Sequence, residues 1–177
     1  MIDEIFDLPV PQRMNQKIIN YLGEQPWNYV SDDSEKYKKP FYDIVSNPLL
    51  KDAGQGIISY KKYGGYRNDD TLNFFGDYIF SLIQERSKFK IKELSRIYWN
   101  LYTPLSECKL HSDDQNVGKF ISAIYNLHTN DGGTQVENQF VTSKESQAIL
   151  FRSEKIHKGI GPKTSNFRLS LSIVMEL

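Results

Sequence analysis

The stretch Leu110-His111-Ser112-Asp113 decides how the rest of the chain is interpreted. Side chains two positions apart on an extended segment point to the same side, so His111 and Asp113 would converge on one point. Two histidines and one carboxylate are typical of non-haem Fe(II) sites that keep open coordination positions. The pattern alone is weak, because an ordinary turn in which Asp113 or Asp114 bonds to the backbone would look the same.

The third ligand must come from elsewhere in a chain with only three histidines. His157 follows the apolar run 148–151, where a strand would end beside a cavity. His128 ends another apolar run next to a predicted surface turn, and we expect it to be solvated. We therefore predict His111, Asp113 and His157 as the metal ligands, with His128 as the competing candidate.

The C-terminal segment 167–176 alternates between apolar and polar residues, which predicts a strand. Arg168 and Ser170 share one face of it and place a cation and a hydroxyl side by side. The alternative is a solvent-facing arginine on an edge strand. An H-x-D pattern followed by a distant histidine and then R-x-S is a more specific signal than any of these pieces alone.

The segment from about Arg96 to the C-terminus resembles the double-stranded β-helix core of the Fe(II)- and 2-oxoglutarate-dependent oxygenases. Within them it is most similar to the prolyl 4-hydroxylase-like branch. Three features depart from that branch. The stretch Tyr102-Thr103-Pro104-Leu105 lacks the usual glycine after the tyrosine, no second tyrosine precedes the metal histidine, and Arg168 stands where a lysine is common. The matching pieces, in the family's order, are Tyr102, His111-Ser112-Asp113, Tyr125-Asn126-Leu127, Asp131-Gly132-Gly133-Thr134, His157, Arg168 and Ser170.

The resemblance implies a mainly β protein with flanking helices and a jelly-roll, cupin-like core. It implies Fe(II) on the three predicted ligands and 2-oxoglutarate as cosubstrate. Arg168 would pair with the distal carboxylate of the cosubstrate, because a guanidinium offers two parallel donors. Further candidates for binding the cosubstrate are Ser170, Tyr102, Tyr98 and Asn100.

The implied activity is that of a dioxygenase that hydroxylates a substrate C–H bond with dioxygen. The substrate would be a peptide or protein residue, with peptidyl proline the first candidate, or a free amino acid, another small metabolite or a nucleobase. No residue is singled out as a general base, so the metal centre carries the chemistry. The alternatives are a cupin-like metal or small-molecule binding protein and an interaction domain with a vestigial site.

Length and composition predict one domain over residues 1–177, with a supporting part at 1–93 and the jelly-roll core at 94–177. Twenty-two basic and twenty-two acidic residues cancel, so overall charge does not favour nucleic acid. A single cysteine, Cys108, suits a reducing compartment. We see no signal peptide and no apolar run of about 18 residues, and expect a cytoplasmic protein without membrane contact.

Periodicity predicts helices near 11–23 and 71–86, packed on one outer face of the β core. Extended segments are expected at 5–9 and 27–30, and strands at 94–102 and 119–127. In segment 94–102, the face with Arg96, Tyr98, Asn100 and Tyr102 is predicted to form the cosubstrate wall. Residues 59–70 combine tyrosines, lysines and two glycines, and are interpreted as a surface loop or lid.

Overall fold

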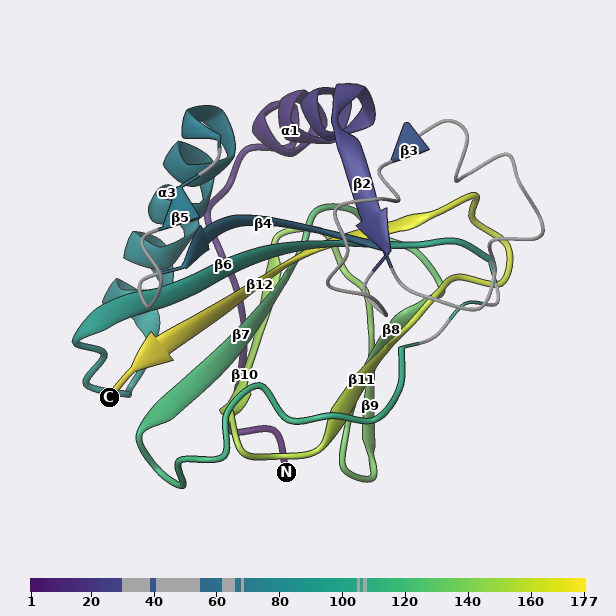
Figure 1. The fold of residues 1–177 in the computed structure, drawn as a ribbon. Helices are drawn as coiled ribbons and strands as arrows, with labels where there is room; N and C mark the ends of the chain where they lie inside the picture. Colours follow the sequence, from purple (N-terminus) through teal and green to yellow (C-terminus); the bar gives the residue numbers. More distant parts are fainter. Residues whose placement is uncertain (30–38, 41–54, 62–65, 68, 105, 107) are drawn as a thin grey trace.

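The computed structural model describes residues 1–29, 39–40, 55–61, 66–67, 69–104, 106 and 108–177. Its strands form two antiparallel sheets that face each other, with the helices outside (Figure 1). The predicted jelly-roll core with flanking helices is therefore confirmed.

The larger sheet has the strand order β1-β10-β7-β12-β6-β4-β2-β3, with β5 paired to β4. The N-terminal part of the chain thus adds strands at both ends of this sheet. Its strands are β1 (Glu4–Asp7), β2 (Pro26–Tyr29), β3 (Lys39–Pro40), β4 (Gln55–Lys61), β5 (Tyr66–Arg67), β6 (Glu93–Tyr102), β7 (Phe120–Asn126), β10 (Gln147–Arg152) and β12 (Arg168–Glu176).

The smaller sheet consists of β8 (Gly133–Val136), β9 (Gln139–Thr142) and β11 (His157–Ile160), in the order β11-β8-β9. At Gly133 this sheet has no room for a side chain, because a Cβ there would lie 2.2 Å from the carbonyl oxygen of Val141. The glycine pair of the 131–134 segment therefore serves close backbone approach at the start of β8.

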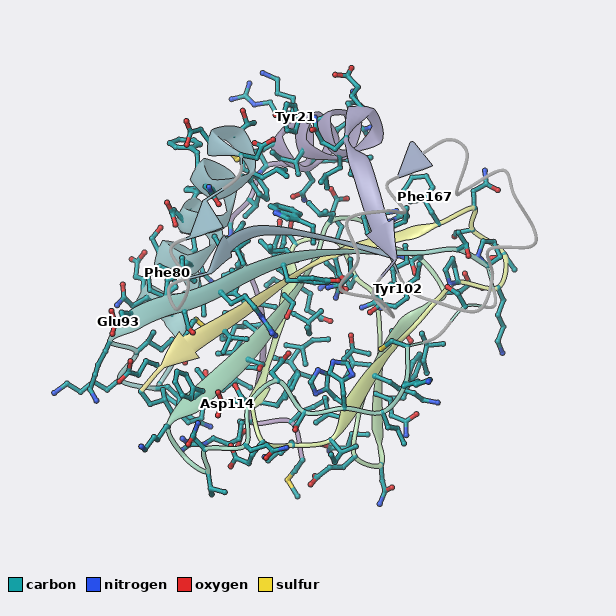
Figure 2. All side chains as sticks on the ribbon, in the orientation of Figure 1. Tyr21, Phe80, Glu93, Tyr102, Asp114 and Phe167 are labelled. Atoms are coloured by element: carbon teal, nitrogen blue, oxygen red, sulfur yellow. The ribbon has the colours of Figure 1, made fainter. Side chains whose placement is uncertain are left out.

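Among the described residues, helices α1 (Gln12–Glu24) and α3 (Asp70–Arg86) cover the outer face of the larger sheet (Figure 1). Asp69 caps α3 by accepting the Leu72 N–H at 2.8 Å. Tyr21 donates to the same carboxylate at 2.7 Å and so links the helices; Figure 2 shows it on the outside of the sheet. No helix in the described part of the chain has both the length and the apolar character that crossing a bilayer requires.

Strand alternation separates two environments across the larger sheet. On β6, Ile97, Trp99 and Leu101 are fully buried under the helices. The opposite face points toward the smaller sheet and is polar. It comprises Arg96, Tyr98, Asn100 and Tyr102 on β6 and, in register beside them, Arg168, Ser170 and Ser172 on β12.

The interpretation of residues 59–70 as a loop is wrong for most of the described positions. Residues 59–61 belong to β4 and 66–67 form β5, which pair as a short hairpin, and α3 begins at Asp70. The mixture of tyrosines, lysines and glycines hid these strands, because it lacks a two-residue alternation of polarity. Residues 62–65 and 68, and with them the predicted lid, lie outside the described residues.

Candidate metal and cosubstrate site

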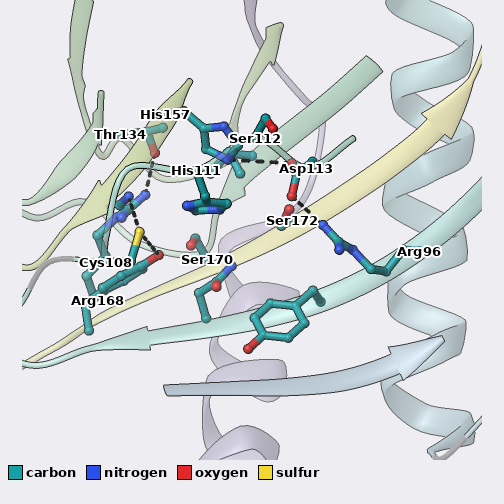
Figure 3. Close-up of a pocket in the computed structure, with 15 residues that line it drawn as sticks. Arg96, Cys108, His111, Ser112, Asp113, Thr134, His157, Arg168, Ser170 and Ser172 are labelled. Atoms are coloured by element: carbon teal, nitrogen blue, oxygen red, sulfur yellow. Dashed lines mark hydrogen bonds and ion pairs between the residues drawn. The ribbon is translucent and has the colours of Figure 1, made fainter. Parts of the chain in front are cut away.

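A cavity of about 280 Å³ lies between the two sheets, and the predicted site residues line it. The larger sheet contributes the polar faces of β6 and β12, and the smaller sheet contributes residues of β8 and β11 (Figure 3). The 108–113 segment closes one side. The cavity is lined by Arg96, Tyr98, Asn100, Tyr102, Cys108, His111, Ser112, Asp113, Ile124, Thr134, His157, Gly159, Arg168, Ser170 and Ser172.

The three predicted metal ligands come together at the centre of this cavity. His111 and His157 exchange backbone hydrogen bonds of 3.0 and 2.8 Å in an isolated β-bridge, which places their rings 4.4 Å apart. One ligand atom from each histidine and from Asp113 lies within 4.8 Å of the other two. Two atoms bound to one ion at about 2.1 Å are at most about 4.2 Å apart, so small side-chain movements would complete the site.

Both histidines present the same ring nitrogen to this point. Nδ1 of His111 lies 2.9 Å from the Lys109 carbonyl oxygen, and Nδ1 of His157 lies 3.0 Å from that of Lys155. A carbonyl only accepts, so Nδ1 carries the proton and Nε2 is the nitrogen available to a metal. A hydrogen bond with Cys108 raises the pKa of His111 to about 9, and a metal bound at Nε2 would displace the second ring proton from that nitrogen.

Asp113 is a buried carboxylate that remains ionised. Burial of its side chain opposes ionisation, but Arg96, His157 and a hydrogen bond from Ser122 outweigh burial and lower its pKa. Ser122 in turn lies 2.8 Å from the hydroxyl of Ser153, whose carbonyl accepts the Asp113 N–H at 3.0 Å. The carboxylate is thus fixed from both sides.

Arg168 lies at one end of the cavity and is 1% exposed. Its Nε donates to the Ser143 hydroxyl at 2.7 Å, and its Nη2 donates to Thr134 at 2.8 Å and to the Asn126 amide oxygen at 3.4 Å. All three partners are neutral, and the salt bridges of the described residues include none to Arg168. Its buried Nη1 also has no hydrogen-bond partner there. A buried cation without an anion is costly, so the arrangement fits an anionic ligand.

Tyr102 lies beside this guanidinium, between the two sheets (Figure 2). Its ring centroid is 5.0 Å from the Arg168 guanidinium carbon, and its hydroxyl is 3.9 Å from Cys108 Sγ. Burial raises the pKa of Tyr102 well above its usual value, so the phenol stays a donor. Gly159 allows this placement, because a Cβ there would lie 2.1 Å from the Tyr102 hydroxyl.

The remaining predicted cosubstrate residues also line the cavity. Asn100 and Ser170 are register partners on β6 and β12, and Tyr98 pairs with Ser172 one step further from Arg168. Burial raises the pKa of Tyr98 to about 12. The polar wall predicted from the alternation of β6 is therefore present, with Arg168 at one end and Arg96 at the other (Figure 3). Tyr102 is the register partner of Arg168.

His128 does not join the cavity, and the expectation that it is solvated is wrong. The ring is half-buried against Phe167, and its Nε2 accepts the Leu169 N–H at 3.0 Å. Burial, together with the nearby Arg168, lowers the pKa of His128 to about 4, so the neutral ring is an acceptor in the backbone network. The segment that follows it is irregular, and Asp131 within it accepts the N–H groups of Lys163 and Thr164 ahead of β12.

Several residues that contact Asp113 or Arg168 had no predicted role in binding them. Arg96 had been assigned only to the polar wall, Thr134 had no clear role, and Ser122, Asn126 and Ser143 had none at all. Ser122 and Asn126 are polar residues within the apolar β7 segment, a usable signal. Ser143 carried no such signal, because only the closure of the small sheet brings it to Arg168.

The fold is similar to that of several solved structures. Matches at TM-scores near 0.6 include a viral collagen prolyl hydroxylase from Paramecium bursaria Chlorella virus-1 (0.60, 12% identity, 98% of this chain and 94% of that chain). A Pseudomonas putida prolyl-4-hydroxylase also matches (0.58, 13%, 98% and 91%). A third is a Trichoplax adhaerens prolyl hydroxylase in complex with a hypoxia-inducible factor peptide (0.62, 13%, 98% and 82%).

Comparisons with family models and with curated proteins find no match. At identities near 12%, the likeness rests on the course of the backbone and not on shared sequence. The chain therefore shares the jelly-roll fold of these three solved prolyl hydroxylases.

Proposed function

We propose that the protein is an Fe(II)- and 2-oxoglutarate-dependent dioxygenase that hydroxylates a substrate C–H bond. The observation that carries this proposal is the pairing of two features in one cavity. Two histidines and an aspartate converge at its centre, and Arg168, a buried cation paired with no carboxylate among the described residues, lies at its end. The oxygenase fold agrees with both.

Each group has a role in this proposal. His111, Asp113 and His157 hold Fe(II), and Arg168 binds the distal carboxylate of 2-oxoglutarate through Nη1, with Tyr102 and Ser170 as further donors. Tyr98 and Asn100 line the wall beside them. Bound together, the metal and cosubstrate supply oxidising chemistry in which dioxygen and 2-oxoglutarate become succinate and carbon dioxide, while C–H becomes C–OH.

The test is succinate formation from 2-oxoglutarate, measured with and without oxygen. Wild-type protein with Fe(II) should form succinate only in air, and His157→Ala should abolish both this turnover and Mn(II) binding. His128→Gln is the matched control, because that histidine lies outside the cavity and should be dispensable. Metal binding without any oxygen-dependent succinate would favour a cupin-like binding protein instead.

For the substrate, we propose a peptidyl proline as the first candidate. Two of the solved neighbours are described as a collagen prolyl hydroxylase and a prolyl hydroxylase bound to a peptide. Proline-containing peptides should raise succinate formation above the uncoupled level, and mass spectrometry should find a gain of one oxygen. A metabolite panel run in parallel would show whether a small molecule stimulates turnover instead.

A further inference from the structure

The two oxygens of Asp113 have different partners. Arg96 Nη2 contacts Oδ1, whereas the Ser122 hydroxyl donates to Oδ2 at 2.6 Å. Oδ2 is also the oxygen that faces Nε2 of His157, 3.6 Å away. One oxygen is therefore directed to the guanidinium and the other to the point where the histidines converge (Figure 3).

We propose that Arg96 is a positioning residue that restricts Asp113 to a single metal–oxygen bond, through Oδ2. This inference rests on the proposed function, which needs the open positions of the ion. Three protein ligand atoms on an octahedral ion leave three positions, enough for a chelating 2-oxoglutarate and dioxygen. A second oxygen from Asp113 would remove one of them.

The surroundings of Arg96 suit this role. Its backbone pairs with Val174 of β12 and with β4 on the other side, so its position is fixed within the larger sheet. The Asp113 side chain is only 5% exposed, which strengthens the ion pair relative to one at the surface. Within the described part of the chain, Oδ1 has no hydrogen-bond or ion-pair partner other than Arg96.

The number of water molecules on bound Mn(II) measures this restriction without any turnover. In the absence of 2-oxoglutarate, water-proton relaxation of wild-type protein with Mn(II) should report three metal-bound waters. Arg96→Met frees Oδ1 to bind the ion, so the count should fall to two and the inner-sphere relaxation by about one third. Arg96→Lys should restore three, because an ammonium still engages one oxygen.

Ser122→Ala is the matched control, since it removes a partner of Oδ2 and leaves the Arg96 contact in place. It should keep three waters, even if Mn(II) binds more weakly. Three waters in Arg96→Met would overturn the inference and leave the proposed function standing. No Mn(II) binding at the triad of the wild type would remove both.

The wild type alone provides a second test, which does not depend on whether the variants fold. The Mn(II)-loaded wild type can be crystallised, and its Asp113 should bind the ion through Oδ2 while Oδ1 stays with Arg96. An Asp113 that chelates the ion through both oxygens in the wild type would refute the assignment without any variant.

Discussion

At the scale of single residues, the two ends of the cavity differ in how their cations are balanced. Arg96 has Asp113 as its anionic partner, whereas Arg168 is held by the neutral groups of Ser143, Thr134 and Asn126. Hydrogen bonds to neutral groups orient a guanidinium but leave its charge uncompensated. Because no anionic partner of Arg168 is found among the described residues, we expect the site to select a cosubstrate that carries a carboxylate at this end.

The first residue-scale prediction is an order of 2-oxoglutarate affinities. Arg168→Ala should lose about 2–5 kcal/mol, roughly 30- to 4000-fold, because it removes a buried charged pair. Arg168→Lys should lose less than Ala because an ammonium keeps the charge, but it should still bind more weakly than the wild type because it cannot contact Ser143 and Thr134 and also present a donor to the ligand. Tyr102→Phe should lose least, about 1.5–3 kcal/mol for one hydrogen bond to a charged group.

Isothermal titration of 2-oxoglutarate into Mn(II)-loaded protein under nitrogen measures this order. His128→Gln is a control that should bind like the wild type. If Arg168→Ala bound the cosubstrate as tightly as the wild type, the anion would bind elsewhere, and the oxygenase proposal would rest on the metal ligands alone.

The second prediction concerns pH and His128, whose pKa is lowered from 6.5 to about 4 in the folded protein. Above pH 6.5 the ring is neutral in both states, and no free energy depends on it. As the pH falls from 6.5 to 4 the unfolded chain takes up the proton first, so folding loses stability over this window. The ring is partly accessible to solvent, so we expect a loss of roughly 1–3 kcal/mol.

Urea unfolding at pH 7, 6, 5 and 4.5 would show this loss. His128→Gln keeps an acceptor for the Leu169 N–H but cannot titrate, so its stability should fall less steeply over the same window. Parallel pH profiles for the two proteins would contradict the lowered pKa of His128 and leave other groups responsible for the acid sensitivity.

At the scale of secondary-structure elements, the approach of β11 to β6 determines the shape of the cavity at the Arg168 end. Gly159 donates its N–H to Cys108 Sγ at 3.0 Å and accepts the Cys108 N–H at 3.0 Å. The Tyr102 hydroxyl lies where a side chain at position 159 would begin. The strand therefore approaches the ring closely only because it carries glycine there.

We predict that Gly159→Ala destabilises the protein by about 1–3 kcal/mol, because β11 or Tyr102 must move to relieve the overlap. A double-mutant cycle with Tyr102→Ala separates this cause from a general strand effect. In the Tyr102→Ala background, Gly159→Ala should cost much less stability. Additive losses in urea unfolding would show that the Tyr102 contact is not what limits position 159.

Element-scale regularities explain how much could be predicted from sequence. The alternation of β6 and β12 predicted the polar cavity wall, because strand side chains alternate between two faces. The H-x-D pattern, together with the distal histidine, predicted the three side chains that converge in the cavity. The contacts of Arg96 with Asp113 and of Arg168 with Ser143 join residues 17 and 25 positions apart and depend on how the sheets close. No local pattern in the sequence encodes them, and the same holds for the placement of His128 against Leu169.

At the scale of the whole molecule, the proposed site joins the two sheets. Arg168 and Tyr102 belong to the larger sheet, His157 to the smaller one, and His111 and Asp113 to the segment that connects β6 with β7. A metal ion and a cosubstrate bound here would therefore act as links across the jelly-roll. Ligands that bind only the folded protein stabilise it by an amount that grows with the logarithm of their concentration relative to the dissociation constant.

We predict that Mn(II) and 2-oxoglutarate stabilise the protein cooperatively. At 100 times its dissociation constant a ligand contributes about 2.7 kcal/mol, or roughly 5–11 °C in Tm for a domain of this size. Added without Mn(II), 2-oxoglutarate has Arg168 but no metal to chelate, so its shift should be far smaller than with Mn(II) present. Asp113→Asn should remove this difference, because it weakens the metal site while leaving Arg168 intact. Thermal unfolding of both proteins under nitrogen, with each ligand alone and with the two together, measures it. Equal 2-oxoglutarate shifts with and without Mn(II) in the wild type would mean that the cosubstrate does not bind at the metal, and that the two ends of the cavity act independently.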